Sequence, residues 1–276
     1  MDYILAIIAG LIQGTTEFLP ISSSGHLVLF HEIMRFNFSN SLLFDIVLHL
    51  GTLVALLICF WRDLLKIIKG FFQSIIRWNV SQDINQKLAW IVVLGTIPAA
   101  LIGYFFEDII TSIFHEGDLA TIVVTFMLAL IALLFLYIEK IATKNREITN
   151  LNWFDSLIIG LAQSMALIPG TSRSGITIIT GMWFGLKREA AAKFSFLLSI
   201  PIILGAGLKS ILDIESINNE EISLLLVGFL SAAISGIVVV KFLLKYLERH
   251  SLSIFAWYRL ILAAVIFLWL IFNIGN

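Results

Sequence analysis

Two polar segments interrupt an apolar chain, and their residue types could bind an anion and act on it. Residues 13–26 read QGTTEFLPISSSGH and residues 169–177 read PGTSRSGIT. The second segment places Arg173 on a glycine-bearing turn among three hydroxyls, those of Ser172, Ser174 and Thr177. A guanidinium beside hydroxyl donors is an arrangement suited to a phosphate group. The pattern therefore predicts an anion site at this turn.

Each segment also carries one ionisable residue of opposite sign, Glu17 and Arg173. A charged side chain within a membrane costs about 2.5–3.5 kcal/mol or more, so both residues need partners or a wet cavity. One interpretation is a buried ion pair that locks the two segments together. We favour a binding site, because hydroxyl donors surround the arginine.

Gln13 and Glu17 are four residues apart and share a face if this stretch is helical. Oxygen ligands so placed could hold Mg²⁺ or Ca²⁺ that bridges phosphate oxygens. His26 follows the serines by two to four residues, close enough for its imidazole to activate a hydroxyl as a nucleophile.

The three serines at 22–24 admit a second interpretation, a turn whose hydroxyls cap the following helix. At an offset of 150 residues, Ser22 matches Ser172, whereas Ser23 stands where the other segment has Arg173. We predict Ser23 as the nucleophile, because chemistry can specialise where the match is broken.

The composition requires a membrane around these segments. The chain has 276 residues, of which 59% are hydrophobic and 13% charged. That charged fraction is about half the usual value for a soluble domain, so we expect one integral membrane domain. The net charge of -1 with scattered basic residues argues against nucleic acid as a partner. Cys59 is the single cysteine, which excludes a disulfide or a thiolate metal site.

Six uninterrupted apolar runs have the length of a membrane span, about 20 residues. They cover residues 41–60, 88–106, 119–138, 190–210, 222–244 and 253–272. Two further apolar regions, 3–36 and 153–186, are each broken by one of the polar segments, which are too polar to face lipid.

Loop charge predicts the orientation of these runs, because cytoplasmic loops carry the excess of lysine and arginine. Four basic regions are assigned inside: Arg62, Lys66, Lys69, Arg77 and Lys87; Lys140, Lys144 and Arg146; Lys187, Arg188 and Lys193; Lys241, Lys245 and Arg249. Two acidic loops are assigned outside: Glu107, Asp108, Glu116 and Asp118; Asp213, Glu215, Glu220 and Glu221. Regions 3–36 and 153–186 then each return to the side they left, as re-entrant hairpins, and both termini lie outside.

The two halves match each other at the same offset of 150 residues. Ungapped identities at this offset include Gly10 with Gly160, Gln13 with Gln163 and Gly25 with Gly175. We predict an all-α polytopic membrane protein with an inverted-topology repeat, six full transmembrane helices plus two re-entrant helix hairpins. Repeat one covers about residues 1–140 and repeat two about 151–276. Such repeats place a polar site near the midplane of the membrane.

The two polar segments resemble the motifs of the undecaprenyl-diphosphate phosphatases, the bacitracin-resistance family of bacterial membranes. The likeness extends over essentially the whole chain and includes GTIP at 95–98 and DSLIIGLAQ at 155–163. It implies hydrolysis of an isoprenyl diphosphate to the monophosphate and phosphate, with a divalent cation, at a site in the bacterial inner membrane that opens outward. The family accepts Glu or Gln at position 13, and this chain carries Gln.

The resemblance also implies roles for residues. Glu17 with Gln13 would engage Mg²⁺ or Ca²⁺, and Arg173 would hold the diphosphate. Ser23 would attack with His26 as base; the alternatives are that His26 is itself the nucleophile or that it activates water, and we favour Ser23. The substrate-binding residues would be Gln13, Ser22, Ser172, Ser174 and Thr177. Membrane lipid surrounds the chain in this interpretation, and a homodimer is one option for its oligomeric state.

A secondary transporter or lipid flippase is the alternative, because inverted repeats with re-entrant hairpins are typical of transporters. Transport needs Glu17 and Arg173 for binding but has no need of a hydroxyl paired with His26. The Ser23/His26 pair therefore favours the enzyme.

Overall fold

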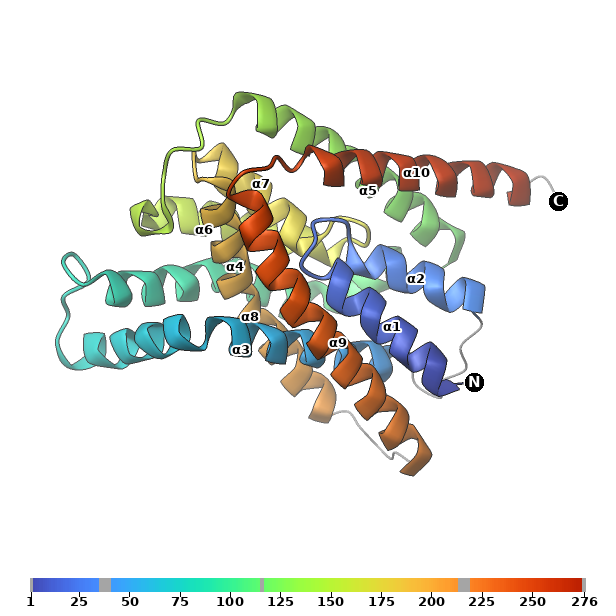
Figure 1. Ribbon diagram of the computed structural model, residues 1–276, viewed down its shortest axis with the longest axis horizontal. Coiled ribbons are helices and arrows are strands. Elements are labelled where there is room, and N and C mark those ends of the chain that lie inside the picture. Colours follow the sequence, from blue (N-terminus) through green and yellow to red (C-terminus); the bar gives the residue numbers. More distant parts are fainter. Residues whose placement is uncertain (1, 35–40, 115–116, 213–218, 275–276) are drawn as a thin grey trace.

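The computed structural model describes residues 2–34, 41–114, 117–212 and 219–274, and every regular element in these ranges is helical (Figure 1). The α-helices are α1 (Asp2–Thr16), α2 (Ser23–Met34), α3 (Ser41–Ile76), α4 (Ile84–Phe114), α5 (Gly117–Ile141), α6 (Trp153–Ser164), α7 (Arg173–Trp183), α8 (Arg188–Leu212), α9 (Asn219–Leu247) and α10 (Ser253–Ile274). The predicted all-α class is confirmed.

Six helices of the described ranges are long and apolar enough to cross a membrane, namely α3, α4, α5, α8, α9 and α10. They coincide with the six predicted runs, so the protein is a multi-pass membrane protein. The remaining four, α1, α2, α6 and α7, are shorter and form the two broken regions.

The predicted extent of the first inside loop is wrong. Helix α3 continues to Ile76 and is 36 residues long, about 54 Å at 1.5 Å per residue, more than a bilayer core of about 30 Å requires. The basic residues that suggested a loop lie between apolar residues at helical spacing, such as Trp61, Leu65, Ile68 and Phe72. This amphipathic pattern lets the helix continue beyond the apolar run.

The two broken regions are helix pairs. Residues 17–22 separate α1 from α2, and residues 165–172 separate α6 from α7. The breaks contain Pro20 in the first pair and Pro169 with Gly170 in the second. Proline cannot donate the backbone hydrogen bond that a helix interior needs, and the residue before it avoids helical geometry. The members of each pair contact each other, as a hairpin requires.

Each hairpin packs on a long helix of the other half, α1 on α9 and α6 on α4. Glycines make this close approach possible: a β-carbon at Gly10 would collide with the carbonyl oxygen of Gly228, and one at Gly160 with that of Gly95. Helix α5 lies beside α10 (Figure 1). The paired exchange of partners between the halves is what a two-fold repeat produces.

The four basic regions predicted on one side do meet at one end of the molecule. Four contacts join them: the ion pairs of Lys193 with Asp63 (2.6 Å) and Arg188 with Glu139 (2.7 Å), and the hydrogen bonds from Lys87 to the Thr149 carbonyl and from the Leu252 amide to Glu139. Of the acidic residues behind the two predicted outer loops, Glu116, Asp213 and Glu215 lie outside the described residues.

Candidate active site

The two hairpin breaks end in matching turns. Ser22 and Ser172 both have positive φ, 76° and 69°. Each serine hydroxyl accepts a hydrogen bond from the amide three residues on, Gly25 (3.4 Å) and Gly175 (3.1 Å). These hydroxyls therefore cap α2 and α7, as the alternative interpretation of the serines predicted for them. A left-handed backbone at a non-glycine residue is strained and is typical of functional turns.

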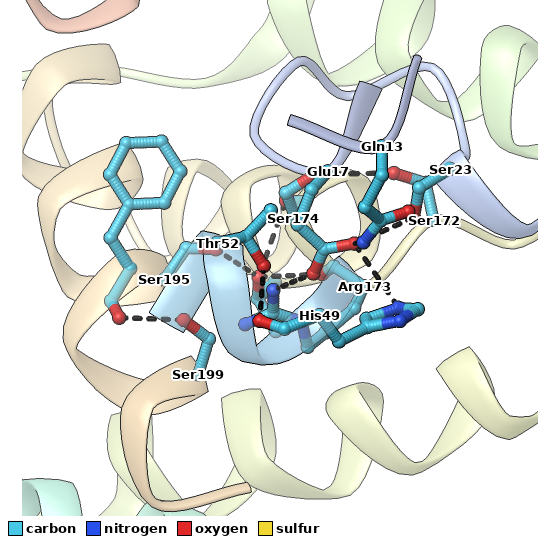
Figure 2. Close-up of polar contacts among 12 residues, drawn as sticks. Gln13, Glu17, Ser23, His49, Thr52, Ser172, Arg173, Ser174, Ser195 and Ser199 are labelled. Atoms are coloured by element: carbon cyan, nitrogen blue, oxygen red, sulfur yellow. Dashed lines mark hydrogen bonds and ion pairs between the residues drawn. The ribbon is translucent and has the colours of Figure 1, made fainter. Parts of the chain in front are cut away.

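Glu17 lies between the two hairpins and is the centre of the site (Figure 2). Its side chain is buried, with one carboxylate oxygen paired with Arg173 of the other hairpin. The other oxygen, Oε2, accepts hydrogen bonds from Ser23 Oγ (2.6 Å) and Gln13 Nε2 (3.1 Å). The structure thus brings together Gln13, Glu17, Ser23 and Arg173, four of the predicted site residues.

The ion pair that the locking interpretation requires is present, and the same carboxylate also accepts the hydrogen bond from Ser23. Ser23 is partly exposed and is not a cap, so its Oγ has a different environment from that of Ser22. The contrast supports Ser23 as the reactive hydroxyl.

The two other predicted hydroxyls of the second hairpin, those of Ser174 and Thr177, lie within α7 and are buried. Ser174 Oγ lies 3.3 Å from Ser172 Oγ and donates to the Leu19 carbonyl of the first hairpin at 3.4 Å. Thr177 Oγ1 donates to the Arg173 carbonyl and lies 2.6 Å from Ser195 Oγ of α8. In this arrangement Thr177 braces the helix that carries Arg173.

His26 does not pair with Ser23, contrary to the prediction. Its Nδ1 lies 2.7 Å from the Ser22 carbonyl oxygen and its Nε2 lies 2.7 Å from the hydroxyl of Tyr258 on α10. The imidazole also stacks on the Tyr258 ring. His26 lies three residues after Ser23 on α2, a spacing that puts both side chains on one face of the helix. Both ring nitrogens are nevertheless occupied elsewhere, by the Ser22 carbonyl oxygen and the Tyr258 hydroxyl.

The imidazole close to Glu17 belongs to His49 of α3. Its Nε2 lies 3.6 Å from Glu17 Oε2, and its Nδ1 donates to the Asp45 carbonyl oxygen at 2.8 Å. His49 and Asp45 are not among the predicted site residues. A polar residue in the middle of a predicted span was the signal that could have found it, because such residues face the interior of a membrane bundle.

Unpaired buried atoms remain around the carboxylate. Gln13 Oε1 and Arg173 Nη1 have no hydrogen-bond partner among the described residues. Buried polar groups without partners are costly, and a bound ligand is one way to satisfy them. One unpaired acceptor and one unpaired donor suit a cation and an anionic oxygen, respectively.

The described residues include no cluster of three histidine, cysteine or acidic side chains that would hold a metal alone. A site with two protein oxygens still fits Mg²⁺, which commonly binds one or two protein oxygens together with phosphate oxygens of the substrate. Glu17 and Gln13 Oε1 would be the protein oxygens.

These features define a class: a multi-pass membrane protein in which two hairpin turns enclose a buried carboxylate, a guanidinium and a serine hydroxyl. Residues 6–265 match the family described as bacitracin resistance protein BacA, and the chain belongs to that family.

Curated relatives share one name. The undecaprenyl-diphosphatase of Rubrobacter xylanophilus is 43% identical over 269 residues, which cover 96% of this chain and 97% of the relative. That of Caldicellulosiruptor bescii is 44% identical over 261 residues, 95% of each chain. That of Methanosphaera stadtmanae is 40% identical over 274 residues, 96% and 97% of the two chains.

Proposed function

We propose that this chain is a membrane phosphatase that hydrolyses undecaprenyl diphosphate to undecaprenyl phosphate and inorganic phosphate. This reaction recycles the lipid carrier of cell-wall synthesis and confers bacitracin resistance. The observation that carries the proposal is the 2.6 Å hydrogen bond from Ser23 Oγ to the buried carboxylate of Glu17, beside Arg173. A transporter needs the ion pair but not an oriented hydroxyl.

Substrate binding would use the positive groups at the two turns. Arg173 Nη1 is free to donate to a phosphate oxygen. The first amides of α2 and α7 add partial positive charge, because the N-terminal amides of a helix have no partner within it. The isoprenyl chain of the substrate would remain among the apolar helix faces.

The chemical step would be a transfer to Ser23. Its Oγ attacks the terminal phosphorus, its proton passes to Glu17 Oε2, and the bond from phosphorus to the bridging oxygen breaks. Undecaprenyl phosphate leaves, and water then hydrolyses the phosphoserine to release phosphate. Catalysis of phosphoryl transfer depends mainly on positioning and charge stabilisation, which Arg173 and the helix termini supply.

Glu17 and Gln13 Oε1 would hold a divalent cation, Mg²⁺ or Ca²⁺, with oxygens of the diphosphate. A bound cation supplies charge neutralisation at the phosphate being transferred. Glu17 would then both accept the proton of Ser23 and bind the cation. His49 Nε2 lies 3.6 Å from Glu17 Oε2, within reach to share that proton.

The site would open on the outer side of the bacterial inner membrane. The support is the charge pattern: the four basic regions gather at one end of the molecule. The first residues of α1 and the last of α10 lie at the other end (Figure 1). A cysteine placed at residue 3 should react with an impermeant thiol reagent added from outside. A cysteine placed at residue 78 should react only when the reagent is added from inside.

The test is phosphate release from undecaprenyl diphosphate by the purified protein in detergent, with Mg²⁺, Ca²⁺ or a chelator. Release that depends on the cation and collapses in Arg173→Ala and Ser23→Ala supports the proposal. His26→Ala, which removes no contact with Ser23, should retain more activity than Ser23→Ala. No release by the folded wild type with any cation would refute the enzyme.

A further inference from the structure

Arg259 of α10 is a buried cation that the sequence did not single out. Its side chain is fully buried, with 0% exposed. It makes five hydrogen bonds to main-chain carbonyl oxygens: Nε to Leu128 (3.2 Å), Nη1 to Pro20 (3.3 Å), and Nη2 to Met127 (3.2 Å), Gly170 (2.9 Å) and Thr171 (3.2 Å). None of the ion pairs among the described residues includes it.

The five acceptors lie in three segments of the chain, and the proposed hydrolysis depends on the relative positions of these segments. Pro20 is in the break of the first hairpin, Gly170 and Thr171 are in the break of the second, and the other two are on α5. A single planar guanidinium, with several donors in a fixed fork, thus ties both turns to one point. Glu17 and Arg173 belong to those same turns, so their separation depends on this tie.

The tie also fixes how the second turn is oriented. In a trans peptide the carbonyl and the following amide point in opposite directions. Because the Thr171 carbonyl faces Arg259, the amide of Ser172 faces away from it, at the start of α7. Gly170 and Ser172 both have positive φ, 85° and 69°, a conformation that persists only when the surroundings hold it. Arg259 supplies that restraint.

A second contact from the same helix reaches the first turn. Tyr258, the neighbour of Arg259, bonds to His26 through its hydroxyl, and His26 in turn contacts the Ser22 carbonyl oxygen. Helix α10 therefore holds the first turn at two points, Pro20 and Ser22. This explains why His26 faces α10 rather than Ser23.

We propose that Arg259 is a positioning residue for the hydrolysis: it does not touch the substrate but sets the distance between the two turns. The proposal rests on the proposed function for its kinetic readout. Its structural content, the restraint of both breaks by one guanidinium, stands apart from the activity.

The experiment compares Arg259→Lys with Arg188→Lys in the full-length protein. Lysine keeps the charge but has three donors on one atom and cannot reach five carbonyls. Arg188 is the control, because it is a partly buried arginine at the end of the molecule where the basic regions meet, and it is bonded to Glu139. For each variant the measurements are the melting temperature, kcat and KM, the inhibition constant of inorganic pyrophosphate with Mg²⁺, and hydrogen exchange over residues 17–25 and 165–175.

For Arg259→Lys we expect kcat to fall by about tenfold or more, since a misplacement near 1 Å can cost about a hundredfold. Pyrophosphate should inhibit more weakly, and amides in both breaks should exchange faster. Arg188→Lys should lower the melting temperature without any of these three changes. The proposal is overturned if Arg259→Lys alters only the melting temperature, or if exchange in the two breaks is unchanged.

Two further arms keep the outcome decisive. If Arg259→Lys does not fold, Tyr258→Phe removes the milder contact and should speed exchange at residues 17–25 but not at residues 165–175. Unchanged exchange in that folded variant would refute the role of α10. If the wild type releases no phosphate, the proposed function fails, while the exchange comparison still decides whether Arg259 restrains both turns.

Discussion

The two hairpins share a few residues that build their turns, and the chemistry lies at positions where they differ. Both end in a serine with positive φ that caps the next helix, Ser22 and Ser172. One residue further on, the first hairpin has Ser23 and the second has Arg173. Four residues after the matched glutamines, the first has Glu17 and the second has Leu167. The shared residues build the turns, and the differing residues make one hydroxyl, one carboxylate and one guanidinium meet.

Gln13 and Gln163 occupy the same position in the two hairpins but have different surroundings. Gln13 donates to Glu17, whereas neither amide atom of buried Gln163 has a partner among the described residues. The second hairpin offers Leu167 where a carboxylate would stand. The glutamine is duplicated but the carboxylate is not, so the second hairpin contributes a guanidinium to the site instead of a second acidic group.

The largest effect is expected from removing the residue that distinguishes the second hairpin. Arg173→Ala takes away the partner of Glu17 and the predicted phosphate donor, so kcat/KM should fall by about 10³-fold or more. Phosphate release with matched protein concentrations measures it. Arg188→Ala is the control, because it breaks a comparable ion pair at the far end. Equal losses in both variants would mean that Arg173 serves stability alone.

Ser23→Ala should come next, with a loss of about 10²–10³-fold in kcat, because it removes the attacking oxygen while binding groups remain. Ser24→Ala is the matched control, since the Ser24 hydroxyl lies 3.3 Å from that of Ser22 and makes no hydrogen bond to Glu17. Single-turnover assays with labelled diphosphate should trap phosphoserine in the wild type. Activity of Ser23→Ala equal to that of Ser24→Ala would reassign the nucleophile.

The paired glutamines give a smaller and more selective test. Gln13→Met should lower kcat/KM by about tenfold, because Glu17 loses a hydrogen bond of a kind worth about 1.5–3 kcal/mol to a charged group. Gln163→Met should keep the activity within about twofold and leave the melting temperature unchanged or higher, since an unpaired buried amide is replaced by an apolar chain. A comparable loss of activity in Gln163→Met would give that glutamine a part in the site.

Much of the fold could be predicted because membrane segments follow simple rules. The runs of apolar residues marked all six spans, and the proline and glycine residues marked both breaks. The helical continuation of α3 past residue 60 escaped, since it depends on amphipathic spacing rather than on apolar length. Loop charge also grouped the four basic regions correctly. They meet at one end of the molecule, where contacts such as the ion pair of Lys193 with Asp63 join them.

The site was predictable in its types of residue and less so in its pairs. The motifs contained Glu17, Ser23 and Arg173, and the repeat implied that the two turns meet. Proximity in sequence suggested His26 as the partner of Ser23, but both ring nitrogens of His26 contact other groups, the Ser22 carbonyl oxygen and the Tyr258 hydroxyl. His49 and Arg259 lie 32 and 242 residues from Glu17, so only the packing of α3 and α10 could reveal them.

The smallest effect is expected where the hairpins are alike, at the capping serines. Ser22→Ala and Ser172→Ala each remove one cap, so each should lower the free energy of unfolding by about 1 kcal/mol. The strained φ remains in both variants, so glycine should restore part of the loss. Melting curves of the four variants in one detergent provide the measurement. Similar losses would support the matched role of the two turns; a much larger loss of activity in Ser22→Ala than in Ser172→Ala would instead place the Ser22 hydroxyl in the reaction, and the two hairpins would differ at one position more than their geometry indicates.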